Sequence, residues 1–170
     1  TEPFDSFETR FCEEAHKQKY DLIFVSQVFF NSGFAMDLNK LIPSLPPTLV
    51  AIDGYHAFMA LPTDLRPFQD KIFYLAGGYK YAQGGEGACF MHVPPQTRHR
   101  PLYTGWFAEI ANLSSVGTDT PYPQNAQQYA GSTLDFSGVY RLRAALELFK
   151  KIQLSVESIH QFIKKHQLYL

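Results

Sequence analysis

The chain has 170 residues, of which 45% are hydrophobic and 18% are charged, a composition typical of a globular domain with one sizeable core. Its formal net charge of −1 gives no electrostatic reason to expect binding to nucleic acid or to an anionic membrane. No apolar run approaches the roughly 20 residues of a membrane-spanning helix, and an acidic N-terminus interrupted by Pro3 argues against a signal peptide.

The N-terminal part of the chain has the periodicity of a helix. Apolar side chains that recur every three to four residues predict an amphipathic helix over residues 5–19. The short apolar run that follows is typical of a buried strand near residues 22–26. After a turn at residues 31–33, residues 37–42 predict one or two helical turns that Pro43 closes.

Two further apolar runs predict buried strands over residues 48–53 and 72–76. About 20 residues separate successive strands, which is crossover length for parallel pairing. A fourth strand, over residues 88–93, follows the third after only about a dozen residues, and we therefore expect it to run antiparallel. Pro62 and Pro67 predict an irregular second crossover.

The C-terminal half begins with a proline-containing, loop-rich stretch over residues 94–133. A strong amphipathic helix follows, and its apolar face contains Val139, Leu142, Leu146, Phe149 and Ile152. Ser155 is a suitable N-cap for a last amphipathic helix. Together these elements predict an α/β fold: a mainly parallel sheet with helices on both faces and one antiparallel strand.

Asp53 and Lys80 each follow a predicted parallel strand, at the sheet edge where open α/β proteins bind ligands. A lysine amine condenses with an aldehyde carbon, and a carboxylate holds a pyridine nitrogen protonated, so this pair suits pyridoxal 5'-phosphate (PLP) chemistry. Spacing alone leaves open a second interpretation, in which Asp53 caps a turn and Lys80 is a surface lysine.

The local sequence resembles the aminotransferase class V family of PLP enzymes, and within it kynureninase-like members. The matching pattern is a strand that ends in Asp53-x-x-His56, a glycine-flanked Tyr79-Lys80 pair, the Gly-Gly-x-Gly run at 84–87 and an antiparallel strand. Further along, Gly105-Trp106-Phe107 is similar to the tryptophan segment of kynureninases. Gly131-Ser132-Thr133 and the next helix are similar to the Gly-Thr segment and interdomain helix of the family.

That resemblance implies a role for each matching residue. Lys80 would hold PLP as a Schiff base, and Asp53 would pair with the pyridinium nitrogen. His56 would lie beside the cofactor, and Tyr79 would donate to its phosphate. Trp106 would reach the phosphate or substrate region, in the partner subunit of a homodimer, and Ser132 and Thr133 would add hydroxyl donors for the phosphate.

The resemblance also implies domain organisation and activity. Residues 1–136 would form part of the large domain of PLP fold type I, and residues 137–170 the interdomain helix and the start of a small C-terminal domain. Kynureninase-like hydrolysis of an amino acid is the nearest function. The alternatives are a class V aminotransferase, a cysteine desulfurase-like enzyme, or a catalytically inactive PLP-fold binding domain.

Two departures from the family pattern bear on these expectations. Kynureninases place an asparagine near the position of Ser132 and Thr133, where it recognises the substrate. The upstream phosphate loop and the downstream arginine that binds the substrate carboxylate have no counterpart here, so we expect residues 1–170 to be the central part of a longer protein.

Other motif classes fit poorly. Gly85 begins a dinucleotide-like pattern, but Phe90 replaces its third glycine and a strand follows in place of a helix. There is no Walker-type or Gly-x-Ser-x-Gly motif, and the six histidines lack metal-ligand spacing. The two cysteines, Cys12 and Cys89, are too few for a secreted disulfide framework, so we expect a cytoplasmic protein with both thiols buried. The expected partner is a small-molecule substrate, an amino acid, and neither nucleic acid nor a membrane.

Overall fold

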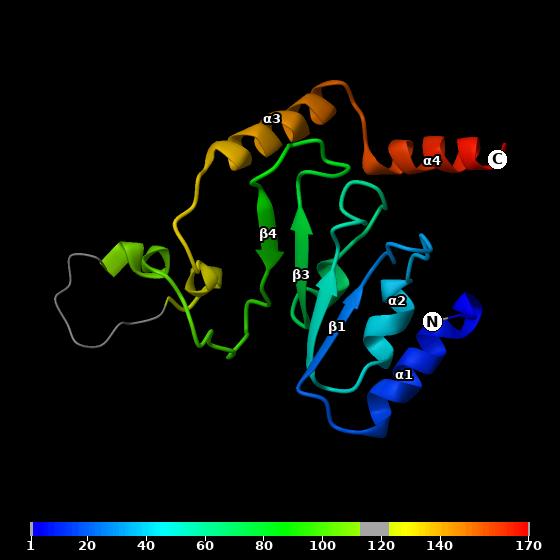
Figure 1. Ribbon diagram of the computed structural model, residues 1–170, viewed down its shortest axis with the longest axis horizontal. Coiled ribbons are helices and arrows are strands. Elements are labelled where there is room, and N and C mark those ends of the chain that lie inside the picture. Colours follow the sequence, from blue (N-terminus) through cyan, green and yellow to red (C-terminus); the bar gives the residue numbers. More distant parts are fainter. Residues whose placement is uncertain (1, 113–122, 170) are drawn as a thin grey trace.

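The computed structural model describes residues 2–112 and 123–169, which form a four-stranded mixed sheet with flanking helices (Figure 1). Its strands lie in the order in which they occur along the chain: β1 (Leu22–Ser26), β2 (Leu49–Asp53), β3 (Ile72–Gly77) and β4 (Cys89–His92). The first two pairings are parallel and the third is antiparallel. The predicted strand directions are confirmed.

One face of the sheet packs against α1 (Phe7–Lys17) and α2 (Leu38–Leu41), which lie side by side in Figure 1. Because side chains alternate along a strand, Ile23 and Val25 of β1 point into this core and are buried. Their neighbours Leu22 and Phe24 point to the opposite face and are 48% and 57% exposed. The predicted N-terminal helix is present, preceded by the short 3-10 helix η1 (Phe4–Ser6).

The opposite face of the sheet is contacted by a 3-10 helix. η4 (Trp106–Asn112) and η5 (Ala126–Tyr129) come from the predicted loop-rich stretch. The ring of Tyr129 in η5 packs edge-on against Phe73 of β3, with centroids 5.9 Å apart. The α/β fold class with helices on both faces is thus confirmed, with α1 and α2 on the core face and the 3-10 helix η5 on the other.

Proline acts differently in the two crossovers. The second crossover contains only η3 (Arg66–Phe68), in agreement with the irregular connection expected there. Pro43, in contrast, does not end the helical segment of the first crossover. The chain continues from α2 into the 3-10 helix η2 (Ile42–Ser44), because Pro43 lies in its first turn, where no backbone N–H is needed.

Two helices complete the chain, α3 (Ser137–Lys151) and α4 (Val156–Gln167). Ser155 caps α4 as expected, in a reciprocal capping box with Ser158. In Figure 1, α3 lies across the end of the sheet where β3 stops and β4 begins, and α4 extends away from it. None of the helices in the described ranges is long and apolar enough to cross a bilayer. The expected domain boundary at residues 136/137 stays a prediction.

Candidate functional site

Lys80 lies in the tight connection between β3 and β4. The chain turns back because the Gly78 N–H donates to the Ala88 carbonyl and the Gly84 N–H donates to the Gly78 carbonyl, both at 2.7 Å. A Cβ atom at Gly78 or Gly84 would meet Leu142 of α3 within 3 Å. The glycine-flanked motif therefore lets α3 pack directly on the lysine turn and fixes its position at the sheet edge.

His56 is the closest partner of Lys80. It lies in a run of turns after β2, in which the Ala57 and Phe58 N–H groups donate to the Gly54 carbonyl. The Lys80 Nζ atom is 2.6 Å from His56 Nε2, and both side chains are half-buried. The Tyr79 ring centroid is 5.6 Å from the same Nζ atom. The structure thus brings together three residues that the motif pattern singled out.

Asp53 is the last residue of β2, which is the parallel neighbour of β3. The two strands end at the same edge of the sheet. Its Oδ2 atom accepts a hydrogen bond from Ser26 Oγ at 3.1 Å, and its Oδ1 atom accepts one from the Tyr55 N–H at 2.9 Å. Ser26 is the register partner of Asp53 across the parallel pair. These two donors fix the half-buried carboxylate and leave each oxygen with a free lone pair for a ligand.

Sequence reasoning missed Ser26, although a signal was present. Ser26 ends the first predicted strand as Asp53 ends the second, and equal offsets in neighbouring parallel strands place residues side by side.

Tyr55 connects the Asp53 region to Cys89 of β4. The two tyrosine rings of Tyr55 and Tyr79 lie over Gly77, with centroids 5.8 Å apart, and a Cβ atom at Gly77 would meet both rings within 3 Å. A side-chain hydrogen bond with Cys89, followed by partial burial, raises the pKa of the Tyr55 hydroxyl to about 12. Tyr55 therefore keeps its proton at neutral pH and remains a hydrogen-bond donor.

The expectation of two buried thiols is wrong for Cys89, which is exposed, while Cys12 is half-buried. Cys89 is the first residue of β4, and β4 is the last strand of the sheet order, with β3 as its one neighbour among the described strands. The position of β4 at the end of the strand order explains the exposure.

Trp106 and Thr133 form a separate unit. The indole Nε1 atom donates to Thr133 Oγ1 at 2.8 Å, and the backbones of Gly105 and Gly131 approach so closely that a Cβ atom at Gly105 would lie 2.8 Å from the Gly131 carbonyl oxygen. Ser132, between them in sequence, is exposed. The contacts of the described residues join Trp106 to Thr133, and they join neither residue to Lys80.

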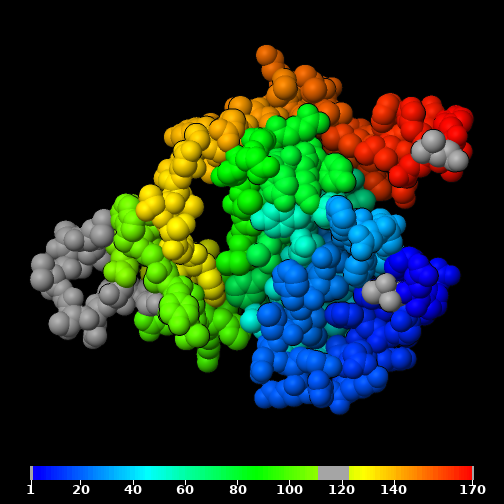
Figure 2. Space-filling view, in the orientation of Figure 1, coloured from blue at the N-terminus to red at the C-terminus, as the bar shows by residue number. Residues whose placement is uncertain are grey.

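The two predicted segments thus meet each other, but away from the lysine turn. Figure 2 shows an open gap between the yellow residues that lead into α3 and the green strands of the sheet.

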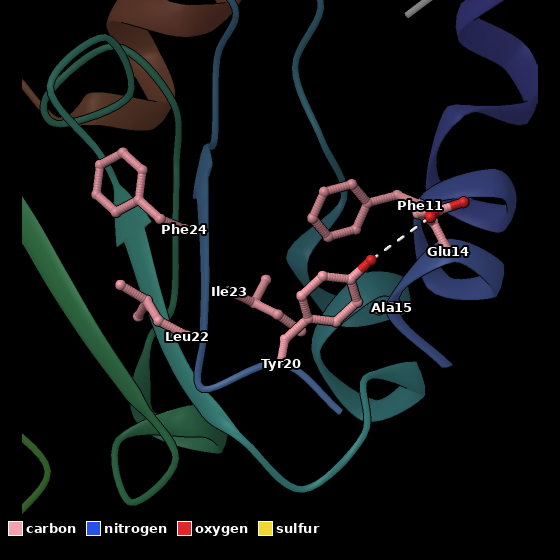
Figure 3. A pocket seen from close by; sticks show the side chains of 7 residues that line it. All are labelled: Phe11, Glu14, Ala15, Tyr20, Leu22, Ile23 and Phe24. Atoms are coloured by element: carbon pink, nitrogen blue, oxygen red, sulfur yellow. Dashed lines mark hydrogen bonds between the residues drawn. The ribbon is translucent and has the colours of Figure 1, made fainter. Parts of the chain in front are cut away.

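A different hollow, of about 230 Å³, lies at the free edge of β1 (Figure 3). Its walls come from the end of α1, the following loop and β1 itself. The lining residues are Phe11, Glu14, Ala15, Tyr20, Leu22, Ile23 and Phe24. Glu14 is its one ionisable carboxylate, and it accepts a hydrogen bond from the Tyr20 hydroxyl at 3.5 Å. The lining offers no amine, so the hollow has no group that could hold an aldehyde cofactor as a Schiff base.

No protein-family model and no curated protein matches the sequence. Among solved structures, the chain is similar to the crystal structure of the cysteine desulfurase CsdA (S-sulfonic acid) from Escherichia coli, with a TM-score of 0.64 and 19% sequence identity. The match covers 87% of this chain and 36% of the desulfurase chain. It supports the predicted fold class, and this chain spans little more than a third of that protein's length.

Proposed function

We propose that this chain is part of a PLP-dependent enzyme of the aminotransferase class V type, which holds its cofactor through Lys80 and acts on an amino acid. The observation that carries the proposal is the 2.6 Å contact between Lys80 Nζ and His56 Nε2, at the sheet edge where Asp53 is also fixed. The fold shared with a cysteine desulfurase supports the same class.

The residues at this edge fit PLP. The cofactor needs an amine for its aldehyde, a carboxylate for its ring nitrogen and donors for its phosphate. Lys80 supplies the amine, and Asp53 supplies a carboxylate whose orientation two hydrogen bonds already fix. Tyr79, which is exposed beside Lys80, offers a hydroxyl donor. When bound, PLP would supply an aldehyde that condenses with amines and a ring that accepts electrons.

His56 acts on the protonation of Lys80. A lysine amine attacks a carbonyl carbon only after it has lost its proton. His56 Nε2 lies within hydrogen-bonding distance of Nζ. When Nε2 carries no proton, the imidazole can accept the proton of the amine and return it later. Asp53 would hold a proton on the ring nitrogen, and the Ser26 and Tyr55 donors would keep its carboxylate in place.

Trp106, Ser132 and Thr133 fit a site completed by a second subunit. Trp106 and Thr133 are joined by a hydrogen bond and lie apart from the lysine turn of their own chain. In a homodimer, this unit could supply its hydroxyl groups to the phosphate in the partner's site. A homodimer and a cytoplasmic location are part of the proposal.

Within this class, the motif pattern from Asp53 to Gly87 favours kynureninase-like hydrolysis. A second candidate, cysteine desulfurase-like chemistry, is favoured by the fold similarity and by the exposed Cys89 thiol beside Tyr55. Product analysis separates them, because hydrolysis of kynurenine releases an aromatic acid whereas desulfuration of cysteine transfers sulfur to a thiol. Cys89→Ser should abolish only the second reaction.

Titration of the protein with PLP tests the proposal as a whole. We expect the visible absorption band of a lysine-linked cofactor, and we expect Lys80→Ala to lose it while Lys71→Ala retains it. A protein that shows no such band, or a Lys80→Ala variant that keeps it, would overturn the proposal. A band without any product from amino acids would favour the inactive binding domain.

A further inference from the structure

Phe30 is an aromatic residue that the proposed site leaves without a role. It follows β1 at the same sheet edge as Asp53 and Lys80, and its side chain is 82% exposed. Exposure of a whole phenyl ring forgoes the free energy that burial would provide. Single exposed apolar residues are common on protein surfaces, and Phe30 differs from the others by its place beside the candidate site.

The loop that carries Phe30 is fixed by its own hydrogen bonds. The Phe29 N–H donates to the Phe34 carbonyl at 2.9 Å, and the Gly33 N–H donates to the Phe29 carbonyl at 2.8 Å. Gly33 has a φ of +68°, which suits the tight turn at the tip. Val28 and Ala35 close the base of the loop with an antiparallel bridge.

Aromatic packing anchors the same loop to the core. The rings of Phe29 and Phe34 stack with centroids 5.8 Å apart, and Phe7 of α1 packs edge-on against Phe29 at 5.1 Å. Two of the three phenylalanines in the loop thus face the core. Because the loop is anchored in this way, Phe30 is held on the outer side.

Phe30 faces the proposed reaction centre. Its ring centroid is 5.6 Å from that of His56, and the two rings are tilted by 46°. His56 in turn contacts the Lys80 amine. Phe30 therefore contacts the residue that contacts the amine, and the Tyr79 ring centroid lies 5.6 Å from Nζ.

We infer that Phe30 determines substrate specificity by contacting the side chain of the amino acid that reacts at Lys80, and that this side chain is large, apolar and planar. The inference rests on the proposed function. An exposed phenyl ring offers dispersion and edge-to-face contacts and no hydrogen bond, so it favours an aromatic side chain over a small or charged one.

The test uses the full protein loaded with PLP, and it measures the cofactor absorption change as single amino acids are added. L-phenylalanine and L-tryptophan are the aromatic probes, and L-alanine is the small one. In Phe30→Ala, we expect the dissociation constants of the aromatic probes to rise by about ten- to a hundredfold, while that of L-alanine is unchanged. Phe30→Tyr should keep the wild-type preference, and so should Phe162→Ala, which removes a 64% exposed ring on α4.

Three results would overturn the inference. The first is an equal loss for aromatic and small amino acids, and the second is a loss of affinity for PLP itself, which would place Phe30 against the cofactor. The third is unchanged binding of every probe. Failure of the proposed function is distinguishable from all three, because the wild-type protein would then show no lysine-linked absorption band at all.

Discussion

The Nζ atom of Lys80 lies 2.6 Å from Nε2 of His56, although 24 positions separate the two residues in sequence. They meet because β2 and β3 are parallel neighbours and end at the same edge of the sheet. His56 lies three residues beyond the end of β2, and Lys80 lies three residues beyond the end of β3.

Removal of the imidazole should slow attachment of the cofactor. In His56→Ala, Lys80 loses its nearest proton acceptor, which takes up the proton that the amine must lose before it attacks. We expect the rate of PLP attachment at neutral pH, followed by absorbance, to fall by about tenfold or more. His16→Ala, which alters an exposed histidine on α1, is the control. Equal rates in the two variants would remove His56 from this role.

Replacement of the Asp53 carboxylate should separate binding from turnover. Asp53→Asn preserves the size of the side chain, so we expect PLP to remain bound. Turnover should fall by about 100-fold or more because the ring nitrogen loses its anionic partner. Ser26→Ala removes one donor to the carboxylate, at 3.1 Å, and should reduce turnover by about tenfold. The measurement is turnover at saturating PLP, and an Asp53→Asn enzyme of normal activity would contradict the assignment.

Substitution of Gly138 should destabilise the fold. A Cβ atom there would lie 2.5 Å from the backbone of Gly87, because α3 packs directly on the lysine turn. We expect Gly138→Ala to lower the free energy of unfolding by about 1–3 kcal/mol, as overpacking does. Gly131→Ala is the matched control, since its nearest neighbour would lie 4.0 Å away. Urea unfolding measures both, and indistinguishable midpoints would show that α3 does not pack there.

Two tyrosines should destabilise the protein as they ionise at high pH. Burial, with a smaller contribution from Asp53, raises the pKa of Tyr74 to about 12, and the hydrogen bond with Cys89 raises that of Tyr55 to about 12. An unfolded tyrosine titrates near pH 10, so between about pH 10 and 12 the folded state binds more protons than the unfolded state.

The stability contributed by these groups is therefore complete below about pH 10 and is lost as the pH rises through their folded pKa values. Denaturant unfolding between pH 9 and pH 12, on the wild type and on Tyr74→Phe, measures this loss. The loss should be smaller in Tyr74→Phe, and an identical pH profile would contradict the raised pKa of Tyr74.

The strand pattern could be predicted because it depends on local signals. Apolar runs marked each strand, and the chain length between runs distinguished the parallel crossovers from the antiparallel return to β4. The glycine-flanked Lys80 and the strand-ending Asp53 followed from the same reading. Pro43 was misjudged because a proline in the first turn of a 3-10 helix gives the same sequence signal as a helix stop.

Side-chain partnerships depended on tertiary geometry. Gln27 is buried, donates a hydrogen bond to Thr63 at 2.9 Å and accepts one from the Tyr74 hydroxyl at 3.1 Å. The periodicity of a sequence does not predict such a network. The exposure of Phe30 was hidden for the same reason, because adjacent Phe29 and Phe30 differ only in which side of a folded loop they occupy.

The central claim is that Lys80 carries the cofactor, and mapping of the attachment site tests it most directly. The protein is incubated with PLP, reduced with borohydride and digested, and the modified lysine is identified by mass spectrometry. The account predicts stoichiometric labelling of Lys80 and its loss in Lys80→Ala. Labelling at Lys40 or Lys71, with Lys80 unmodified, would contradict it.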